Sequence, residues 1–164
     1  MKTVKGLTKT LYGEFSLKRI SVCEGAPADC KTPESLLNLW NEGPAKAEWF
    51  DVDKECLVVF ALNTKLRCTG FFLIALGSLN ECTARISEIL KPLIVANCHS
   101  FCLSHNHPSG DSLPSQADID LTRKLNEASR IMGIRLQDHV IISNPNYLAA
   151  GHQGYFSFRE GGLL

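Results

Sequence analysis

Residues 100–118 read SFCLSHNHPSGDSLPSQAD, and the fold is organised around this stretch. Its apolar start predicts a buried strand that delivers His105, turn residues follow His107, and a long helical pattern begins at Ser115. Side chains at positions i and i+2 of an extended segment leave on the same side, so we expect both histidines to point into one pocket. Asp118 lies one turn into the helix, where the loop can return it to the histidines. Two imidazoles, one carboxylate and a fourth position for water are typical of a hydrolytic zinc site.

Each part of this pattern also has an interpretation without a metal. A His-x-His pair occurs by chance in many proteins, and Ser115 followed three residues later by Asp118 fits a helix capping box. The capping box is compatible with a metal site, because the N-terminus of a helix is a favourable place to anchor a carboxylate. The combined pattern is more specific than either half.

The pattern resembles the JAMM motif of the MPN/JAB metalloprotease superfamily, and in detail it resembles the RadC-like branch. The matching segments are HNHPSG at 105–110, PSQAD at 114–118, LTRKL at 121–125, DHVII at 138–142 and SFREGGLL at 157–164. The resemblance is strong over 55–164 and looser before that. One departure is ARISE at 84–88, where the family often carries a Pro-Arg-Glu-like signature, so a shared substrate contact there is not carried over.

This resemblance implies an α/β domain of the MPN type, a curved mixed sheet flanked by helices. We expect a flexible N-terminus over 1–10 and a single RadC-like MPN/JAB domain over 11–164. The implied activity is that of a metallopeptidase or isopeptidase, in which a metal-activated water attacks an amide bond of a peptide or isopeptide substrate. The implied cofactor is one Zn²⁺ ion, held by His105, His107 and Asp118.

A hydrolase of this kind needs a general base that is not itself a metal ligand. Glu55 is our candidate, because it opens an apolar strand pattern and resembles the glutamate that opens the corresponding family strand. An ordinary solvated glutamate is the alternative for this residue. Glu48, Glu81 and Glu88 are competing carboxylates, of which Glu88 is the weakest because its surroundings are helical.

Three further polar residues near the motif have predicted roles. By resemblance, Ser115 donates a hydrogen bond to the oxyanion, although a plain helix N-cap is its alternative role. Asn106 lies between the histidines, so it is expected to point away from the metal and to fix the loop. His139 is predicted to be a buried structural histidine rather than a ligand.

The bulk composition sets limits on function. The 164 residues are 45% hydrophobic and 21% charged, with a formal net charge of zero, so a single globular domain is expected and direct nucleic-acid binding is not favoured. No apolar run has the roughly 20 residues of a membrane span or forms a signal-peptide core. Seven cysteines without a CxxC pair indicate thiols in a reducing cytoplasm. A second metal cluster at Cys98, His99 and Cys102 is not favoured.

Two other functions stay open at this point. The first is a DNA-repair role, the usual label of RadC-like proteins, although a helix-hairpin-helix region has no counterpart in this sequence. The second is a module that keeps the fold and the metal for binding alone.

Periodicity and turn residues predict the remaining elements. Expected strands are 12–22 (an edge strand), 55–62, 68–76, 100–104 and 136–143. Of the three expected helices, one begins at Thr32, one covers 85–97 and one begins at Ser115. Residues 147–164 are expected to form a closing segment anchored by Tyr155, Phe156 and Phe158. The buried stripe of the longest helix is predicted to be Leu121, Leu125, Ala128 and Met132.

Overall fold

The computed structural model describes residues 28–77, 84–143 and 153–164. The elements follow the chain as α1 (Pro33–Glu42), a 3₁₀ turn η1 (Pro44–Lys46), β1 (Cys56–Leu62), β2 (Cys68–Leu76), α2 (Ile86–Val95), β3 (Ser100–His107), α3 (Gln116–Met132), β4 (Arg135–Ser143) and β5 (Tyr155–Ser157). The predicted edge strand over 12–22 and the flexible N-terminus over 1–10 lie outside the described residues.

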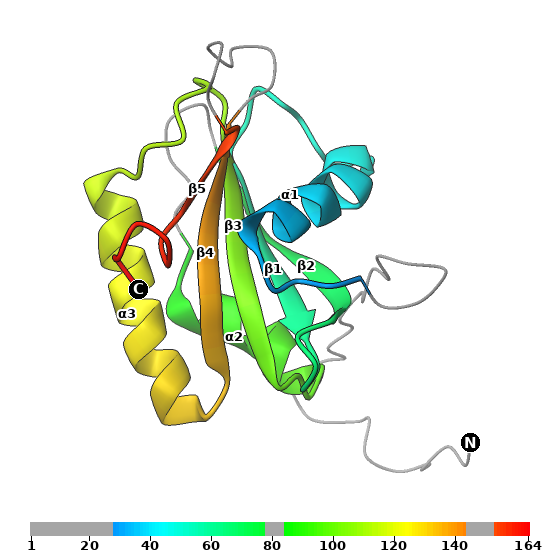
Figure 1. Cartoon of the computed structure of the whole chain (residues 1–164), viewed down its shortest axis with the longest axis vertical. Helices are drawn as coiled ribbons and strands as arrows, with labels where there is room; N and C mark the ends of the chain where they lie inside the picture. The colour runs from blue at the N-terminus through cyan, green and yellow to red at the C-terminus, as the bar shows by residue number, and fades with distance from the viewer. Residues whose placement is uncertain (1–27, 78–83, 144–152) are drawn as a thin grey trace, which may run out of the picture.

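The sheet is mixed, with strand order β2-β1-β3-β4-β5 (Figure 1). β1 pairs antiparallel with β2 and with β3, β3 pairs parallel with β4, and β4 pairs antiparallel with β5. The predicted hairpin of β1 and β2 and the central place of β1 are confirmed. β1 and β3 are almost wholly buried, as expected for strands covered on both faces.

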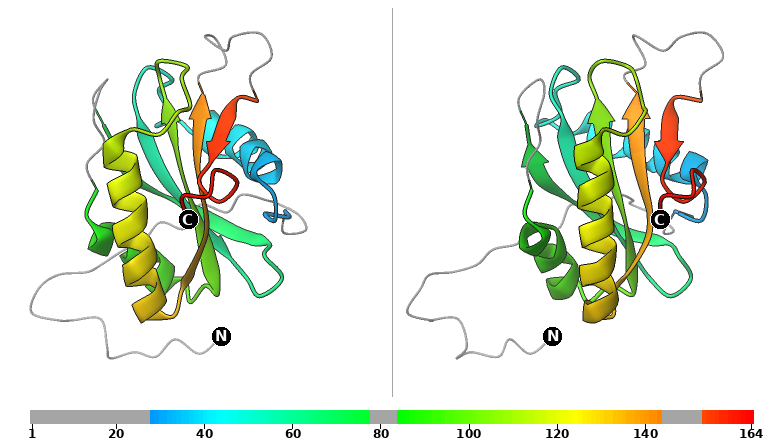
Figure 2. Two further views of the ribbon diagram at one scale, coloured as in Figure 1. Left: turned by 60° about the vertical axis from the view of Figure 1, so that its left-hand side comes forward. Right: turned by 90° about the vertical axis from the view of Figure 1, so that its left-hand side faces the viewer.

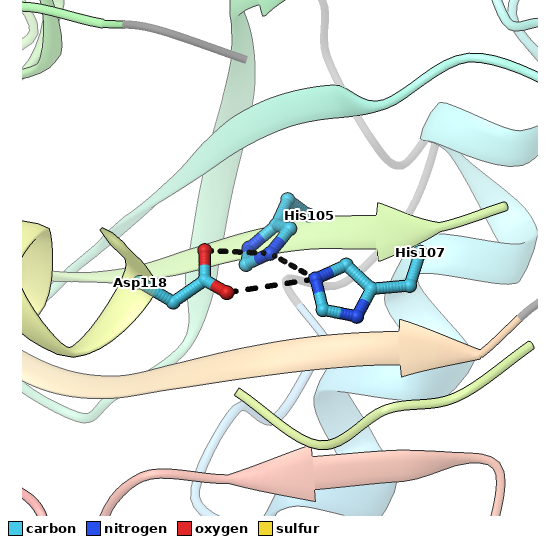
Figure 3. Close-up of side chains that lie close together, drawn as sticks. All are labelled: His105, His107 and Asp118. Atoms are coloured by element: carbon cyan, nitrogen blue, oxygen red, sulfur yellow. Dashed lines mark hydrogen bonds and ion pairs between the residues drawn. The ribbon is translucent and has the colours of Figure 1, made fainter. Parts of the chain in front are cut away.

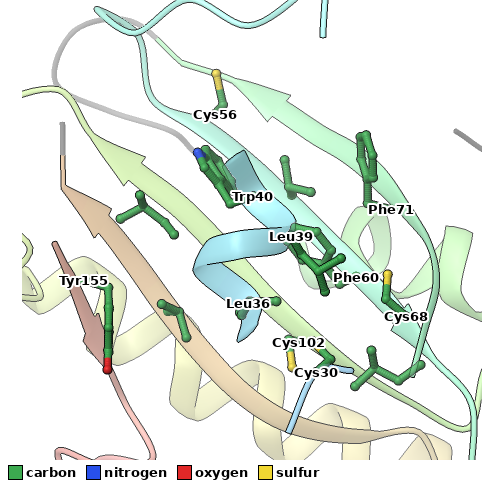
Figure 4. Close-up of a cluster of buried hydrophobic side chains, with 14 residues drawn as sticks. Cys30, Leu36, Leu39, Trp40, Cys56, Phe60, Cys68, Phe71, Cys102 and Tyr155 are labelled. Carbon is green, nitrogen blue, oxygen red and sulfur yellow. The ribbon is translucent and has the colours of Figure 1, made fainter. Parts of the chain in front are cut away.

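Helices cover both faces of the sheet, so the domain has three layers, as expected for an α/β fold (Figure 2). On one face α1 packs Leu36, Leu39 and Trp40 against the even-numbered residues of β1 (Figure 4). On the other face α2 and α3 pack against the odd-numbered residues of β1 and β3. The two core clusters follow directly from the two-residue period of the strands.

The helix ends are set by local sequence. Thr32 caps α1 through a capping box, and α1 ends at Gly43, where a Cβ atom would come within 2.8 Å of the Phe71 ring. Ser115 caps α3, and Gly133 ends it with a φ of 70°, a conformation that suits glycine. These boundaries agree with the predicted ones.

Met132 is 48% exposed, so its assignment to the buried stripe of α3 is wrong; Thr122, Leu125 and Ser129 are the buried residues. Met132 lies seven residues after Leu125, on nearly the same side of α3, so its exposure follows from its place at the end of the helix rather than from the helical period. Tyr155 and Phe158 are buried anchors, as predicted, and Phe156 is half-buried.

The cysteines Cys30, Cys56, Cys68, Cys98 and Cys102 are free thiols, in agreement with the predicted absence of disulfides at these positions. Cys23 and Cys82 lie outside the described residues. No helix in the described ranges has both the length and the apolar character to cross a bilayer.

Candidate metal centre

The end of β3 and the first turn of α3 bring His105, His107 and Asp118 together (Figure 3). β3 continues through His107, beyond the predicted end at residue 104, so both histidines belong to one extended strand and leave it on the same face. Their Nε2 atoms are 3.0 Å apart. Nε2 of His105 lies 3.2 Å from Oδ1 of Asp118, and Nε2 of His107 lies 3.6 Å from Oδ2.

These three separations are close to those of a tetrahedral metal site. Ligand bonds of about 2.0–2.2 Å place the ligand atoms about 3.3–3.6 Å from one another in tetrahedral geometry, and the separations in this cluster are 3.0, 3.2 and 3.6 Å. Among the histidine, cysteine and carboxylate side chains of the described residues, these three lie close enough together to hold a metal ion. His139 and the Cys98–Cys102 segment are not part of that group.

The hydrogen bond of His107 fixes its tautomer. Nδ1 of His107 lies 2.7 Å from the carbonyl oxygen of Asp111. A carbonyl oxygen only accepts, so Nδ1 carries the proton and Nε2 of the neutral ring presents a lone pair to the centre.

The tautomer of His105 is fixed by a buried relay. The hydroxyl of Thr122 donates to the carbonyl oxygen of Asp118 at 2.6 Å, so it accepts from Nδ1 of His139 at 2.6 Å. Nε2 of His139 is then the acceptor for Nδ1 of His105 at 2.9 Å. Nε2 of His105 is therefore unprotonated as well.

Two lone pairs and a carboxylate thus converge on one point. At 3.0 Å two unprotonated nitrogens repel each other unless a cation lies between them and Asp118. The side chains are 4%, 13% and 15% exposed, so water compensates little of that repulsion. The two nitrogens and the carboxylate therefore fit a metal ion. In a metal-free site, an added proton would relieve the repulsion between the nitrogens.

The pKa values of the cluster agree with this need for positive charge. Burial lowers the pKa of His107, but Asp118, the Asp111 carbonyl and the charge of Glu55 together raise it above 6.5. Burial raises the pKa of Asp118. Hydrogen bonds from imidazoles that carry the added proton, and from Ser115, outweigh burial and hold that pKa well below 3.8 in the metal-free site.

Ser115 holds the carboxylate in place. Its hydroxyl donates to Oδ2 of Asp118 at 2.6 Å and its backbone N–H donates to the same oxygen at 2.8 Å. In return the Ser115 hydroxyl accepts from the backbone N–H of Asp118 at 3.2 Å. The capping box is confirmed. The oxyanion role of Ser115 stays a prediction, since its hydroxyl proton is directed to Asp118.

Asn106 points away from the histidines, as predicted, and fixes the segment that carries Glu55. Its Oδ1 accepts from the Cys56 N–H at 2.8 Å, and its Nδ2 donates to the Lys54 carbonyl at 2.9 Å. Asn106 is 3% exposed, and its amide therefore binds the backbone on both sides of Glu55. The loop it fixes is thus the one before β1.

The register of β1 and β3 indicates where Glu55 stands. Leu57 pairs with His105, so the same antiparallel register places Glu55, just before the strand, opposite His107 and on its face of the sheet. Glu55 is half-buried, and its charge acts on His107.

The competing carboxylates have other places in the structure. Glu48 is exposed, and Glu88 caps α2 through the backbone N–H of Arg85. Glu81 lies outside the described residues.

His139 is fully buried, as predicted, and its ring stacks on Phe158 at 4.5 Å. Burial lowers its pKa well below 6.5, which keeps the ring neutral. The role of Thr122 was missed by sequence reasoning. Its position four residues after Asp118, on the same face of α3, is the signal that could have found it.

Comparison with known proteins places this site in a family. The family model described as RadC-like JAB domain matches residues 31–163. The chain belongs to this family. A UPF0758 protein of Caldanaerobacter subterraneus is 36% identical over 135 residues, which are 82% of this chain and 56% of the relative. A UPF0758 protein of Clostridium beijerinckii is 39% identical over 139 residues, 84% of this chain and 58% of the relative.

A UPF0758 protein of Pelodictyon phaeoclathratiforme is 43% identical over 114 residues, 70% of this chain and 48% of the relative. The chain thus spans about half the length of the curated relatives it matches. The name UPF0758 states no activity.

Proposed function

We propose that this RadC-like JAB domain is a zinc-dependent hydrolase that cleaves an amide bond in a peptide or isopeptide. The observation that carries the proposal is the convergence of two unprotonated imidazole nitrogens and one carboxylate. Nitrogen and oxygen ligands at these separations suit zinc, and three protein ligands leave a fourth position open for chemistry.

A zinc ion at this centre would lower the pKa of water towards about 7 and polarise a substrate carbonyl. The chain itself supplies the groups around it. To Glu55 we assign the role of taking a proton from the attacking water and passing it to the leaving amine; the strand register and the effect of its charge on His107 support this role. Asn106 holds the backbone on both sides of that carboxylate.

The relay from Thr122 through His139 keeps Nε2 of His105 unprotonated towards the centre. Such outer hydrogen bonds orient metal-binding histidines and tune their basicity. Ser115 orients the carboxylate of Asp118 in the same way from the other side. Both arrangements are features of a catalytic metal site as much as of a binding one, so turnover must be tested separately.

The test is a screen of peptide and isopeptide substrates with zinc-loaded wild type and Glu55→Gln. Glutamine keeps the size and hydrogen-bonding ability of Glu55 but cannot take a proton. We expect equal zinc content, and a hydrolysis rate about 10²–10⁴-fold lower in the variant, the usual contribution of general acid–base catalysis.

Retained hydrolysis in Glu55→Gln would remove Glu55 from the mechanism. Zinc-loaded protein without hydrolysis of any amide substrate would favour a metal-binding interaction module. Loss of zinc in Glu55→Gln would make Glu55 a ligand and contradict the three-ligand centre.

A further inference from the structure

A second polar hollow lies at the far end of α3 from the histidines. It has a volume of about 540 Å³ and lies between the last turns of α3, the start of β4 and the C-terminal segment after β5. Figure 1 shows this C-terminal segment folded back beside α3. Arg130, Arg135 and Arg159 line the hollow together with Asn126 and Gln137. Pockets of this size suit a small molecule.

The three arginines come from three different elements, and the residues that line the hollow with them include no Asp or Glu. None of them forms an ion pair among the described residues. By contrast Arg123, which lies on α3 like Arg130, pairs with Asp120 at 3.5 Å. The chain as a whole has a formal net charge of zero, so this hollow is a local excess of positive charge. A concave surface of one sign concentrates ions of the other.

The carboxylate of Asp138, one residue after Gln137, is buried and does not line the hollow. It accepts from the Ser157 hydroxyl at 2.6 Å and from the Arg159 backbone N–H at 3.0 Å, and the residue is 3% exposed. Burial raises its pKa. Asp138 therefore fixes the backbone of Arg159 rather than occupying the hollow.

The Arg159 side chain is also held in place. One of its guanidinium nitrogens donates to the Lys31 carbonyl at 2.9 Å, which leaves its other N–H groups for a ligand. A guanidinium that is already ordered loses less conformational freedom when it binds.

We propose that this hollow binds a small phosphate-bearing molecule through Arg130, Arg135 and Arg159. Guanidinium groups bind phosphate through paired N–H donors, and a tetrahedral anion offers oxygens in several directions, as three arginines from three elements require. A planar carboxylate offers only two oxygens. Arg130 lies twelve residues after Asp118 along α3, a rise of about 18 Å, so the hollow is distinct from the metal centre.

The test is an NMR titration of the zinc-loaded full chain with inorganic phosphate, with sulfate and citrate as comparison anions. A His107→Ala variant is titrated in parallel, because phosphate could otherwise bind zinc. We expect saturable shifts at the amides around Arg130, Arg135 and Arg159 in both proteins. Sulfate should reproduce them, and citrate should bind more weakly.

The double variant Arg130→Gln with Arg135→Gln should weaken phosphate binding about tenfold or more, since a hydrogen bond to a charged group contributes about 1.5–3 kcal/mol. The matched control is Arg67→Gln with Arg123→Gln, two exposed arginines outside the hollow with the same change in net charge. It should stay within about twofold of wild type, because it alters only screened long-range charge.

Three results would overturn the proposal. One is shifts that spread over the surface without saturation. Another is equal weakening in the control pair. The third is tighter binding of citrate, which would indicate a carboxylate ligand.

Discussion

The two ends of α3 both gather charged side chains, and they do so in opposite ways. At the N-terminal end, Asp118 and two histidines are packed together, with side chains between 4% and 15% exposed and a hydrogen bond on the Nδ1 atom of each ring. At the C-terminal end, three arginines line an open hollow without an ion pair among the described residues.

The two ends of α3 differ in how strongly their side chains constrain the ligand that each can bind. Exposed arginines are compensated by water whether or not a ligand binds, so that end needs a binding experiment. Buried lone pairs that face one another are compensated only by a cation. The hydrogen bonds of the N-terminal end therefore fit a cation, either a metal ion or an added proton.

Breaking the buried relay should have the largest effect among the variants that keep all three ligands. His139→Phe retains the stacked ring but removes the acceptor for Nδ1 of His105. We expect zinc affinity to fall about 10–100-fold, the usual cost of losing an outer-shell partner.

Thr122→Val leaves His139 in place and should weaken zinc less, and Ser129→Ala, an equally buried hydroxyl at the other end of α3, should not weaken it. Competition with a zinc chelator measures all three. Unchanged affinity in His139→Phe would show that the relay does not determine the tautomer of His105.

The variant Asn106→Leu tests whether the segment before β1, which carries Glu55, must be held in place for hydrolysis. The change removes two buried hydrogen bonds on either side of Glu55, so unfolding should become easier by about 1–3 kcal/mol. The rate of hydrolysis should fall as well, with zinc content unchanged.

The matched control for Asn106→Leu is Asn63→Ala. Asn63 accepts backbone hydrogen bonds from Lys65 and Arg67 at the opposite end of β1. Asn63→Ala should lower the free energy of unfolding but leave the rate of hydrolysis nearly unchanged. If both variants lose the same stability and the same rate, Asn106 has a structural role only.

Changing the two caps of α3 compares its ends directly. Ser115→Ala removes the cap and the hydroxyl that holds Asp118, at a cost of about 1 kcal/mol in stability. Gly133→Ala places a side chain at a φ of 70° where no atom obstructs it, at a cost of about 1–2 kcal/mol.

We expect denaturant unfolding to show similar losses for the two variants, and zinc binding to weaken only in Ser115→Ala. Weaker zinc binding in Gly133→Ala would mean that the metal centre responds to general loss of stability.

The effect of pH should be the smallest. The pKa of His107 is raised above 6.5 in the folded, metal-free chain, so protonation of His107 stabilises this form at low pH and the stabilisation is lost as pH rises through the raised pKa. The lowered pKa of Asp118 contributes stability above 3.8 that persists until much lower pH.

Zinc competes with the proton on His107, so zinc affinity should increase from about pH 6 to about pH 8 while the melting temperature of the metal-free chain decreases. Thermal unfolding and chelator competition across this range check both signs. A metal-free chain that becomes more stable over that range would contradict the raised pKa of His107.

Most of this fold was predictable because strand and helix periods are local. The apolar run of β1 and the caps of α3 at Ser115 and Gly133 each follow from a few neighbouring residues. The three candidate ligands were predictable for the same reason, since two lie two residues apart on one strand and the third opens the next helix.

The hydrogen bonds that fix the ligands were not predictable. The relay joins β3, α3 and β4, and the Asn106 clamp joins residues 50 positions apart, so both depend on sheet order and register. The exposure of Met132 likewise depends on where the helix leaves the sheet.

Elemental analysis of the purified protein tests the central claim most directly. The account predicts one zinc ion per chain in wild type and in the double variant Arg130→Gln with Arg135→Gln, which alters only the far end of α3. His107→Ala should lose the metal, because two ligands remain where three are needed. Equal zinc content in His107→Ala and wild type, or no metal in either, would contradict the assignment of His105, His107 and Asp118 as the metal centre.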